Sequence, residues 1–218
     1  MKGHLLFTLV LSFVLLQSLG AEAAFRVIDA DTISDGRITY RLNGIDAPEM
    51  GQACSSQTGK KWKCGEAATS YLAAKLKSAS IRCEGSSQDR YGRTIATCFA
   101  DGKDIGESLV ASGLAWSFRR YDMVYAQTED TARAAKLGIW AGNNMPPWEF
   151  RAAKWAVGEQ KAPDGCPIKG NISKNGKIYH APWSPWYGRT KVSPSKGERW
   201  FCNEAEALAA GWRAPAWQ

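Results

Sequence analysis

Residues 25–49, FRVIDADTISDGRITYRLNGIDAPE, hold the pattern that decides the fold of this chain. Residues 25–33 are rich in β-branched side chains and alternate between apolar and polar positions, and residues 37–45 alternate again after the pair Asp35-Gly36. Two alternating runs around an Asp-Gly turn predict a β-hairpin. We therefore expect two antiparallel strands at the start of a folded unit.

Further strand and helix signals follow this hairpin. In chain order they are a loop rich in Gly, Ser and Lys (50–64), a helix (66–77), a second hairpin (80–84 and 94–100, turning at 89–92), and two helices (105–112 and about 124–137). Gly113 and Gly138 follow the last two helices, and Gly is the usual C-terminal cap. Short strands with intervening helices and close turns predict an α+β, mainly β, unit built on a small OB-type barrel.

The first 23 residues have the pattern of an export signal. Lys2 precedes an almost wholly apolar run from Leu5 to Leu19, and Ala21-Glu22-Ala23 is a small-x-small cleavage site. A membrane-spanning helix is the alternative, but the run is shorter than the roughly 20 apolar residues that a bilayer requires. We expect a secreted or periplasmic protein with no membrane span in its mature chain.

The composition is that of a soluble globular protein with polyanionic partners. Hydrophobic residues make up 44% and charged residues 22%, which excludes disordered and collagen-like classes. Lys and Arg exceed Asp and Glu by 28 to 21, a net charge of +7. Residues 143–218 hold 11 of the basic but only 6 of the acidic residues, and seven of the ten Trp. We divide the mature chain into units 24–142 and 165–218, joined by a linker at 143–164.

Six Cys in an exported chain indicate disulfides, and six allow 15 connectivities. Cys83 and Cys98 flank the predicted turn at Arg90-Tyr91, so a hairpin would set them opposite each other. The spacing of all six Cys favours disulfides between neighbours in the sequence: Cys54 with Cys64, Cys83 with Cys98, and Cys166 with Cys202. Metal binding by Cys is the competing interpretation, but the chain has no C-x-x-C pair and only two His. We expect His180 to be a structural or surface residue.

Carboxylates gather around the first hairpin. Asp31 and Asp46 fall near facing ends of its strands, where hard oxygen ligands for Ca²⁺ can converge. Arg41 lies five residues before Asp46, and Pro48 fixes a turn that returns Glu49 toward the same place. Each Asp taken singly has the position of a turn residue. Their clustering with an Arg around one hairpin favours a metal-assisted site.

The segment Asp89-Arg90-Tyr91-Gly92-Arg93 forms the turn of the second hairpin. Taken alone, Arg93 has the position of a solvated surface charge. A hairpin clamped by Cys83 and Cys98 would hold it more firmly than a loop would. Paired with Arg41, it becomes a two-armed clamp for phosphate oxygens, which the planar guanidinium fork suits.

Taken together, these motifs resemble the staphylococcal nuclease (thermonuclease) family. D-x-D-T, R-L-x-G-I-D-A-P-E, D-R-Y-G-R, A-D-G-K-D-I-G-E-S-L-V-A-S-G-L-A and L-G-I-W follow the family's order and spacing over about residues 25–142. The resemblance implies a five-stranded OB-fold barrel with three helices. It also implies a calcium-dependent phosphodiesterase acting on DNA and RNA. We expect a monomer with no stable protein partner.

The resemblance assigns roles to eight residues. They are the calcium ligands Asp31, Asp46 and Ala47 (main-chain carbonyl), the phosphate-binding Arg41 and Arg93, the general base Glu49, and the nucleotide-contacting Tyr91 and Tyr121. Ala30 stands where the family usually has Gly, and Ala47 where Thr is common. Neither change removes a required functional group. The loop after Glu49, with its two Cys and basic run, departs further from the family.

The second unit, residues 165–218, shows short strand signals and a terminal helix at 204–210. It resembles the small zinc-binding module at the start of bacterial alkylation-repair methyltransferases, but the usual Cys ligands do not appear. We therefore expect a metal-free module held by Cys166 and Cys202. Its basic and aromatic side chains suit holding nucleic acid; attachment to the cell envelope is the other interpretation.

Two classes of function are compatible with this sequence. The first is an exported calcium-dependent nuclease. The alternative is a non-catalytic OB-type protein that binds single-stranded nucleic acid by stacking and a basic groove. A pure binder has no need of the matched catalytic residues, so the sequence favours the enzyme.

Overall fold

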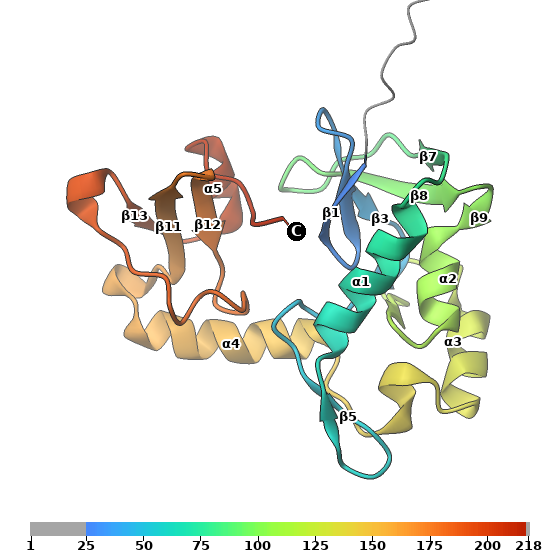
Figure 1. The fold of residues 1–218 in the computed structure, drawn as a ribbon. Coiled ribbons are helices and arrows are strands. Elements are labelled where there is room, and N and C mark those ends of the chain that lie inside the picture. The colour runs from blue at the N-terminus through green and yellow to red at the C-terminus, as the bar shows by residue number, and fades with distance from the viewer. Residues whose placement is uncertain (1–24, 217–218) are drawn as a thin grey trace, which may run out of the picture.

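The structure, a computed structural model, describes residues 25–216 and has two lobes (Figure 1). The predicted export signal at 1–23 lies outside the described residues. Among the helices of residues 25–216, none is long and apolar enough to cross a membrane. The first lobe contains β1 (Arg26–Asp29), β2 (Thr32–Ser34), β3 (Thr39–Leu42), β4 (Ile45–Asp46), β5 (Cys54–Ser55), β6 (Lys61–Trp62), α1 (Cys64–Leu76), β7 (Ile81–Glu84), β8 (Thr94–Ala100), β9 (Lys103–Asp104), α2 (Ile105–Ala111), β10 (Trp116–Ser117) and α3 (Ala126–Ala134).

The main sheet of this lobe follows the path β1-β2-β3-β8-β7, and β9 extends it from β8. Neighbouring strands are antiparallel except β3 and β8, which run parallel with Tyr40 beside Thr94. The core lies between this sheet and the helices α1 and α2. Fully buried aliphatic side chains fill it: Ile33, Leu42, Leu72, Leu109 and Val110. The predicted OB-type α+β fold with three helices is confirmed, and β9 adds a sixth strand to the five that were predicted.

The single strand predicted at residues 25–33 is wrong, because the chain turns within it. Ala30 and Asp31 form a tight turn between β1 and β2, and the Asp29 carboxylate accepts a hydrogen bond from the Asp31 N–H at 3.2 Å. Asp side chains stabilise such turns by bonding to nearby backbone. The alternating pattern continues through the turn and hides it. The turn places Asp29 and Asp31 together at one end of the sheet.

All three predicted disulfides are present: Cys54–Cys64, Cys83–Cys98 and Cys166–Cys202. Cys83 and Cys98 face each other directly across β7 and β8, as the hairpin argument requires. The loop predicted at 50–64 contains a short hairpin of β5 and β6, which the first disulfide closes. Three disulfides indicate an oxidising compartment.

The ends of α2 and α3 differ from each other. Gly113 follows α2 with a left-handed φ of +63°, as predicted. The helix α3 is shorter than predicted, because Lys136 takes the left-handed cap position at φ +54° instead of Gly138. Gly138 is required for a different reason. A Cβ there would lie 2.1 Å from the Gly113 carbonyl oxygen, so the two glycines permit a close crossing of backbones.

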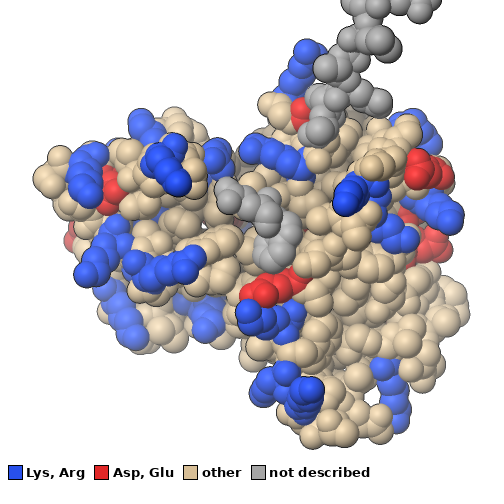
Figure 2. All heavy atoms as spheres, in the orientation of Figure 1, with Lys and Arg blue, Asp and Glu red and all other residues tan. Residues whose placement is uncertain are grey.

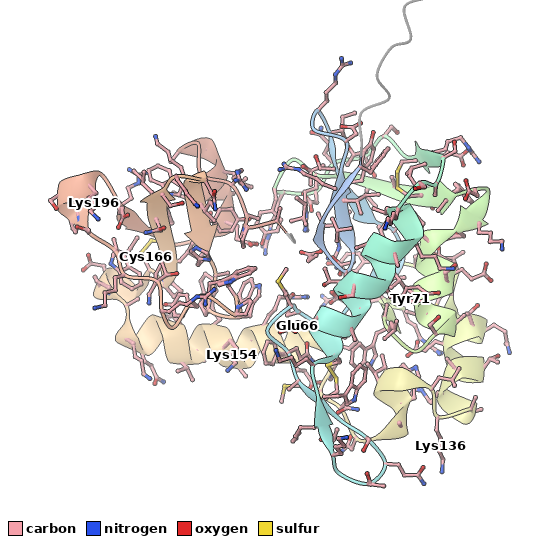
Figure 3. All side chains as sticks on the ribbon, in the orientation of Figure 1. Glu66, Tyr71, Lys136, Lys154, Cys166 and Lys196 are labelled. Carbon is pink, nitrogen blue, oxygen red and sulfur yellow. A yellow bond between two sulfur atoms is a disulfide. The ribbon has the colours of Figure 1, made fainter. Side chains whose placement is uncertain are left out.

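The second lobe contains the predicted strands and terminal helix, and one helix that the sequence did not predict. Its elements are α4 (Pro147–Lys161), β11 (Ile168–Ser173), β12 (Gly176–His180), β13 (Arg199–Phe201) and α5 (Glu204–Ala209), with short 3-10 turns at Pro163–Gly165 and Pro194–Lys196. The strand β11 lies between β12 and β13 in an antiparallel sheet. Cys166, labelled in Figure 3, ties the start of this sheet to Cys202 before α5.

Most of the predicted linker is helix α4, and its first turns pack on the first lobe. The Asn144 side chain donates to the Ser55 carbonyl at 3.0 Å and accepts from the Ser55 N–H at 2.6 Å. The Trp148 ring stacks on Phe118 at 5.6 Å between centroids. Farther along, a Cβ on Gly51 would lie 2.7 Å from the Trp183 carbonyl oxygen. Packing is therefore continuous across residue 142, and both lobes meet beside the first hairpin.

His180 gives the second lobe a predicted pH dependence. Burial, together with the positive charges of Arg189 and Lys169, lowers the pKa of His180 to about 4. The unfolded chain binds a proton near pH 6.5. Stability contributed by neutral His180 is therefore complete above that pH and is lost as the pH falls toward 4. We expect the loss to be roughly 1–3 kcal/mol after allowance for solvent screening. Urea unfolding of wild type and His180→Gln between pH 7 and 4 measures it, and identical pH profiles would contradict it.

Candidate active site

Two buried carboxylates share one arginine at the end of the first hairpin. Asp31 follows β1, Arg41 lies in β3 and Asp46 lies in β4. Arg41 pairs with Asp31 through one terminal nitrogen, and the other donates to Asp46 Oδ1 at 2.9 Å. The second oxygen of Asp31 accepts from the Ala47 N–H at 3.0 Å. Asp46 is 0% exposed and Asp31 3% exposed, so the protein fixes both carboxylates in a dry environment.

A second arginine, Arg151 from α4, reaches the same carboxylates. Its guanidinium forms a fork on Asp46, with nitrogen–oxygen distances of 2.8 and 3.1 Å, and also donates to Glu49 Oε1 at 2.7 Å. Bidentate pairs of this kind are among the strongest charge-assisted hydrogen bonds. Glu49 is held from its backbone as well, since its N–H donates to the Gln52 side chain at 3.1 Å. The C-terminal lobe thus contributes a cation directly to the cluster.

Burial perturbs the acids and bases of this cluster. It raises the pKa of Glu49 to about 8, against the opposing effect of Arg151. It also raises the pKa of the Asp31 carboxyl, although Arg41 opposes the change. For Arg41, burial alone would lower the pKa, but Asp31, Asp46 and Asp29 together raise it above its usual range. The arginine therefore stays charged, and Glu49 is far more basic than a solvent-exposed carboxylate.

Arg93 reaches the cluster from the second hairpin. Its Nε donates to Asp89 Oδ2 at 2.7 Å, and its Nη1 lies 3.4 Å from the Thr32 hydroxyl. Asp89 also accepts the backbone N–H groups of Tyr91 and Arg93, at 2.9 and 3.0 Å. Asp89 in the turn thus holds the Arg93 guanidinium by its Nε. The Arg93 guanidinium carbon lies 5.3 Å from the centre of the Tyr91 ring.

Side chains of both lobes line one hollow of about 340 Å³ around this cluster. Its charged lining residues are Asp29, Arg41, Glu49, Arg90, Arg93, Arg151 and Glu204. Glu204 comes from α5, and burial raises its pKa in spite of the nearby Arg93. The Tyr179 hydroxyl faces the Glu204 carboxyl. The hollow is therefore a mixed-charge cleft between the lobes, with arginines from three different elements.

The structure brings together seven of the eight predicted site residues. Asp31, Arg41, Asp46, Ala47 and Glu49 are linked by the contacts above, and Arg93 and Tyr91 line the hollow. Tyr121 is the exception. It is 75% exposed and packs on Phe118 with ring centres 4.8 Å apart, and it is not among the residues that line the hollow. Tyr121 is therefore not included among the residues of the candidate active site.

The sequence did not identify Arg151, Asp29 and Glu204 as site residues. Arg151 is separated from Asp46 by 105 positions and lies in a segment predicted as a linker. Glu204 lies in the second unit, for which the sequence predicted no chemistry. Asp29 is the first residue of the D-x-D-T motif, and this motif could have identified it as a site residue.

The buried carboxylates are a favourable place for positive charge, although no three metal-ligating side chains lie together among the described residues. Asp31 and Asp46 both turn oxygens toward Arg41, and Arg151 occupies the outer face of Asp46 and Glu49. The guanidinium groups of Arg41 and Arg151 therefore lie next to carboxylates that favour positive charge. Buried carboxylate oxygens with an adjacent carbonyl are the donors that Ca²⁺ prefers.

Two family models match separate parts of the chain. The family model described as "Staphylococcal nuclease homologue" matches residues 39–142. A second model, ArfC, matches residues 149–214. The second unit thus matches ArfC rather than the methyltransferase module that it resembles in sequence, and the match includes most of α4.

Several curated proteins are similar to this chain. The succinoglycan biosynthesis protein ExoI of Rhizobium meliloti (strain 1021) is 43% identical over 118 residues, which are 52% of this chain and 61% of that protein. An uncharacterized endonuclease of Haemophilus influenzae is 30% identical over 159 residues, covering 67% and 84%. The micrococcal nuclease of Shigella flexneri is 31% identical over 163 residues, covering 64% and 88%. The chain thus spans less than two thirds of ExoI but most of the other two proteins.

Proposed function

The chain belongs to the staphylococcal nuclease family, and we propose that it is an exported, calcium-dependent nuclease that hydrolyses phosphodiester bonds of DNA and RNA. One observation carries the proposal. Glu49 and two arginines from separate hairpins, Arg41 and Arg93, line a single hollow, and Arg41 is paired with two buried carboxylates, Asp31 and Asp46. Clusters of this kind are typical of phosphoryl-transfer sites, where the main need is to stabilise charge.

Calcium is the proposed cofactor, held by Asp31, Asp46 and the main-chain carbonyl of Ala47. When bound, it supplies positive charge for the phosphate oxygens and makes a bound water more acidic. The fixed positions of both carboxylates support this assignment: Arg41 bonds to both of them, and the Ala47 N–H bonds to Asp31.

The protein side chains divide the remaining work. Arg41 and Arg93 bind the scissile phosphate, whose oxygens gain negative charge as water attacks. Asp89 holds Arg93 by its Nε and the Thr32 hydroxyl lies 3.4 Å from its Nη1, so the Nη2 edge of the guanidinium faces the substrate in this proposal. Glu49 accepts a proton from the attacking water as the new phosphorus–oxygen bond forms. As in the family, we propose that the 5′ oxygen leaves and takes a proton from solvent water, so that a 3′-phosphate remains.

Export is supported by the three disulfides, because such bonds persist in oxidising compartments. The proposed location is the periplasm or the extracellular space. The net charge of +7 favours association with polyanionic substrates wherever they are met.

A cleavage assay separates the nuclease from a non-catalytic binder. The purified chain is incubated with DNA or RNA in calcium, and acid-soluble nucleotides are measured. We expect release that chelator abolishes and added calcium restores. Retarded migration of single strands without release of nucleotides would instead establish the binder.

Arg151 provides a separate prediction about calcium binding. Its guanidinium lies on Asp46, so it competes with a divalent cation for the same oxygen atoms. Unit charges about 4 Å apart interact by about 4 kcal/mol near a protein surface. We therefore expect Arg151→Met to bind calcium at least roughly tenfold more tightly in calorimetry, a change of about 1.4 kcal/mol.

The matched control is Lys154→Met, which removes a positive charge from the same helix without touching the carboxylates; its ammonium lies over the Phe150 ring. Figure 3 labels Lys154 on α4. Equal calcium affinity in wild type and both variants would show that Arg151 does not compete for the ion.

A further inference from the structure

A second hollow, of about 400 Å³, lies beside the catalytic one, and the surface exposed inside it is mostly apolar, although three of its residues carry charged or amide side chains. Seven residues line it: Arg90, Tyr91, Trp155, Trp183, Asn203, Glu204 and Ala205. Trp155 comes from α4, Trp183 follows β12, and Ala205 lies in α5. The volume is within the range of about 300–1,000 Å³ that is usual for small-molecule sites. The second lobe therefore supplies most of an aromatic recess next to the cleft.

The two tryptophans are positioned as a pair. Their ring centres are 6.1 Å apart with an interplanar angle of 36°, and both side chains are half-buried. Trp155 also contacts the core of its lobe, so the fold restrains it. A half-buried, restrained aromatic ring that borders a recess can bind a flat ring with little loss of side-chain entropy.

The apolar recess and the catalytic hollow form one continuous surface. Arg90, Tyr91, Trp155, Trp183 and Glu204 line both. Tyr91 lies between the two hollows and contacts two arginines. The guanidinium carbon of Arg93 is 5.3 Å from the centre of the Tyr91 ring, and that of Arg90 is 4.7 Å from it. A phosphate held by Arg93 therefore has aromatic surface directly beside it.

Charge favours a nucleic-acid strand as the occupant. Arg90 borders both the recess and the hollow, and arginines from both lobes border the hollow. Figure 2 shows Lys and Arg side chains spread over the visible face of the second lobe, where residues 143–218 carry 11 basic and 6 acidic residues. A polyanion that alternates phosphates with flat apolar rings matches this alternation of arginine and aromatic side chains.

We propose that Trp155 and Trp183 form a nucleobase-binding subsite, so that the second lobe holds an unpaired base of the strand whose phosphate lies at Arg41 and Arg93. This proposal rests on the proposed function and names the preferred form of its substrate. A base within a duplex is stacked on its neighbours and cannot enter the recess without being unstacked. The subsite therefore favours single-stranded DNA or RNA over duplex.

The test compares two single-stranded probes of equal charge in the presence of chelator, so that nothing is cleaved. One is a deoxythymidine octamer, and the other is an octamer of the same backbone without bases. Both are bound to the full chain at one fixed salt concentration, because phosphate contacts are salt-dependent. For wild type we expect the base-bearing octamer to bind about 5- to 100-fold more tightly, the range of base–aromatic stacking.

Trp155→Leu and Trp183→Leu keep an apolar side chain but remove the ring. We expect each to reduce the preference for the base-bearing octamer by at least roughly fivefold, with little change for the octamer without bases. Trp200→Leu is the matched control, since Trp200 is a partly buried tryptophan of β13 that does not line the recess. We expect it to retain the wild-type preference.

Ala205→Phe tests the same subsite without changing either tryptophan, so it can be used if a tryptophan variant fails to fold. This change fills the recess from α5 and leaves both tryptophans in place, and the same loss of preference is expected. Wild-type preference in folded Trp183→Leu and Ala205→Phe would overturn the subsite. Cleavage in calcium is measured on the same preparations, so a chain that binds bases but does not cleave contradicts the proposed function alone.

Discussion

Replacing Glu49 by Gln is expected to lower kcat for DNA cleavage by about 10²- to 10⁴-fold, the usual contribution of a general base. The amide cannot accept a proton from the attacking water. It preserves the shape of the side chain, and its oxygen can still accept the hydrogen bond from Arg151 that Glu49 accepts at 2.7 Å. The fold and the position of α4 are therefore expected to be unchanged.

Initial rates at saturating DNA and calcium measure this effect. Circular dichroism and calcium calorimetry on the same variant serve as controls, and both are expected to match wild type. A folded Glu49→Gln protein with near-native kcat would remove Glu49 from the catalytic assignment, whatever the other residues do.

Arg93→Ala is expected to cost about 10²- to 10³-fold in kcat, because one preorganised charge contact to the transition state is lost. The turn itself is expected to persist. Asp89 still accepts the backbone N–H groups of Tyr91 and residue 93, and the Cys83–Cys98 disulfide holds the strands together.

The matched control for Arg93 is Arg82→Ala. Arg82 lies in β7 of the same hairpin, its side chain is 62% exposed, and it pairs with Glu84 outside the hollow. Cleavage rates of the two variants are compared at equal calcium. Equal rates would show that Arg93 contributes only general positive charge.

The predictable part of the fold is the part that local signals determine. The hairpin of β7 and β8 follows from alternation, a central turn and two Cys that have to face each other. The helix α2 ends at a Gly with left-handed geometry, which has a simple sequence signal. The turn at Ala30 and Asp31 escaped prediction because it does not interrupt the alternation of apolar and polar residues.

In the active site, too, the residues that lie close together in the sequence could be predicted, and those brought in by long-range packing could not. Asp31, Arg41, Asp46 and Glu49 are close in sequence and meet because one hairpin and the turn after it hold them. Arg151 joins them only through the packing of α4 against the first lobe, and long-range packing has no local sequence pattern. The nucleotide contact of Tyr121 comes from its family position alone and stays a prediction, and the structure places its ring on Phe118.

The most direct test of the carboxylate–arginine site is calcium titration of wild type and Asp31→Asn by two methods. Asn is preferred to Ala, because its oxygen can still accept a hydrogen bond from the Arg41 nitrogen that Asp31 binds, whereas Ala would leave that part of the buried guanidinium unpaired. Calorimetry gives the calcium affinity, and DNA cleavage gives the calcium concentration for half-maximal rate. We predict one bound calcium in wild type and, in Asp31→Asn, an increase of roughly tenfold or more in both values, because a charged ligand is lost. Wild-type values by both methods in a folded Asp31→Asn protein would contradict the site.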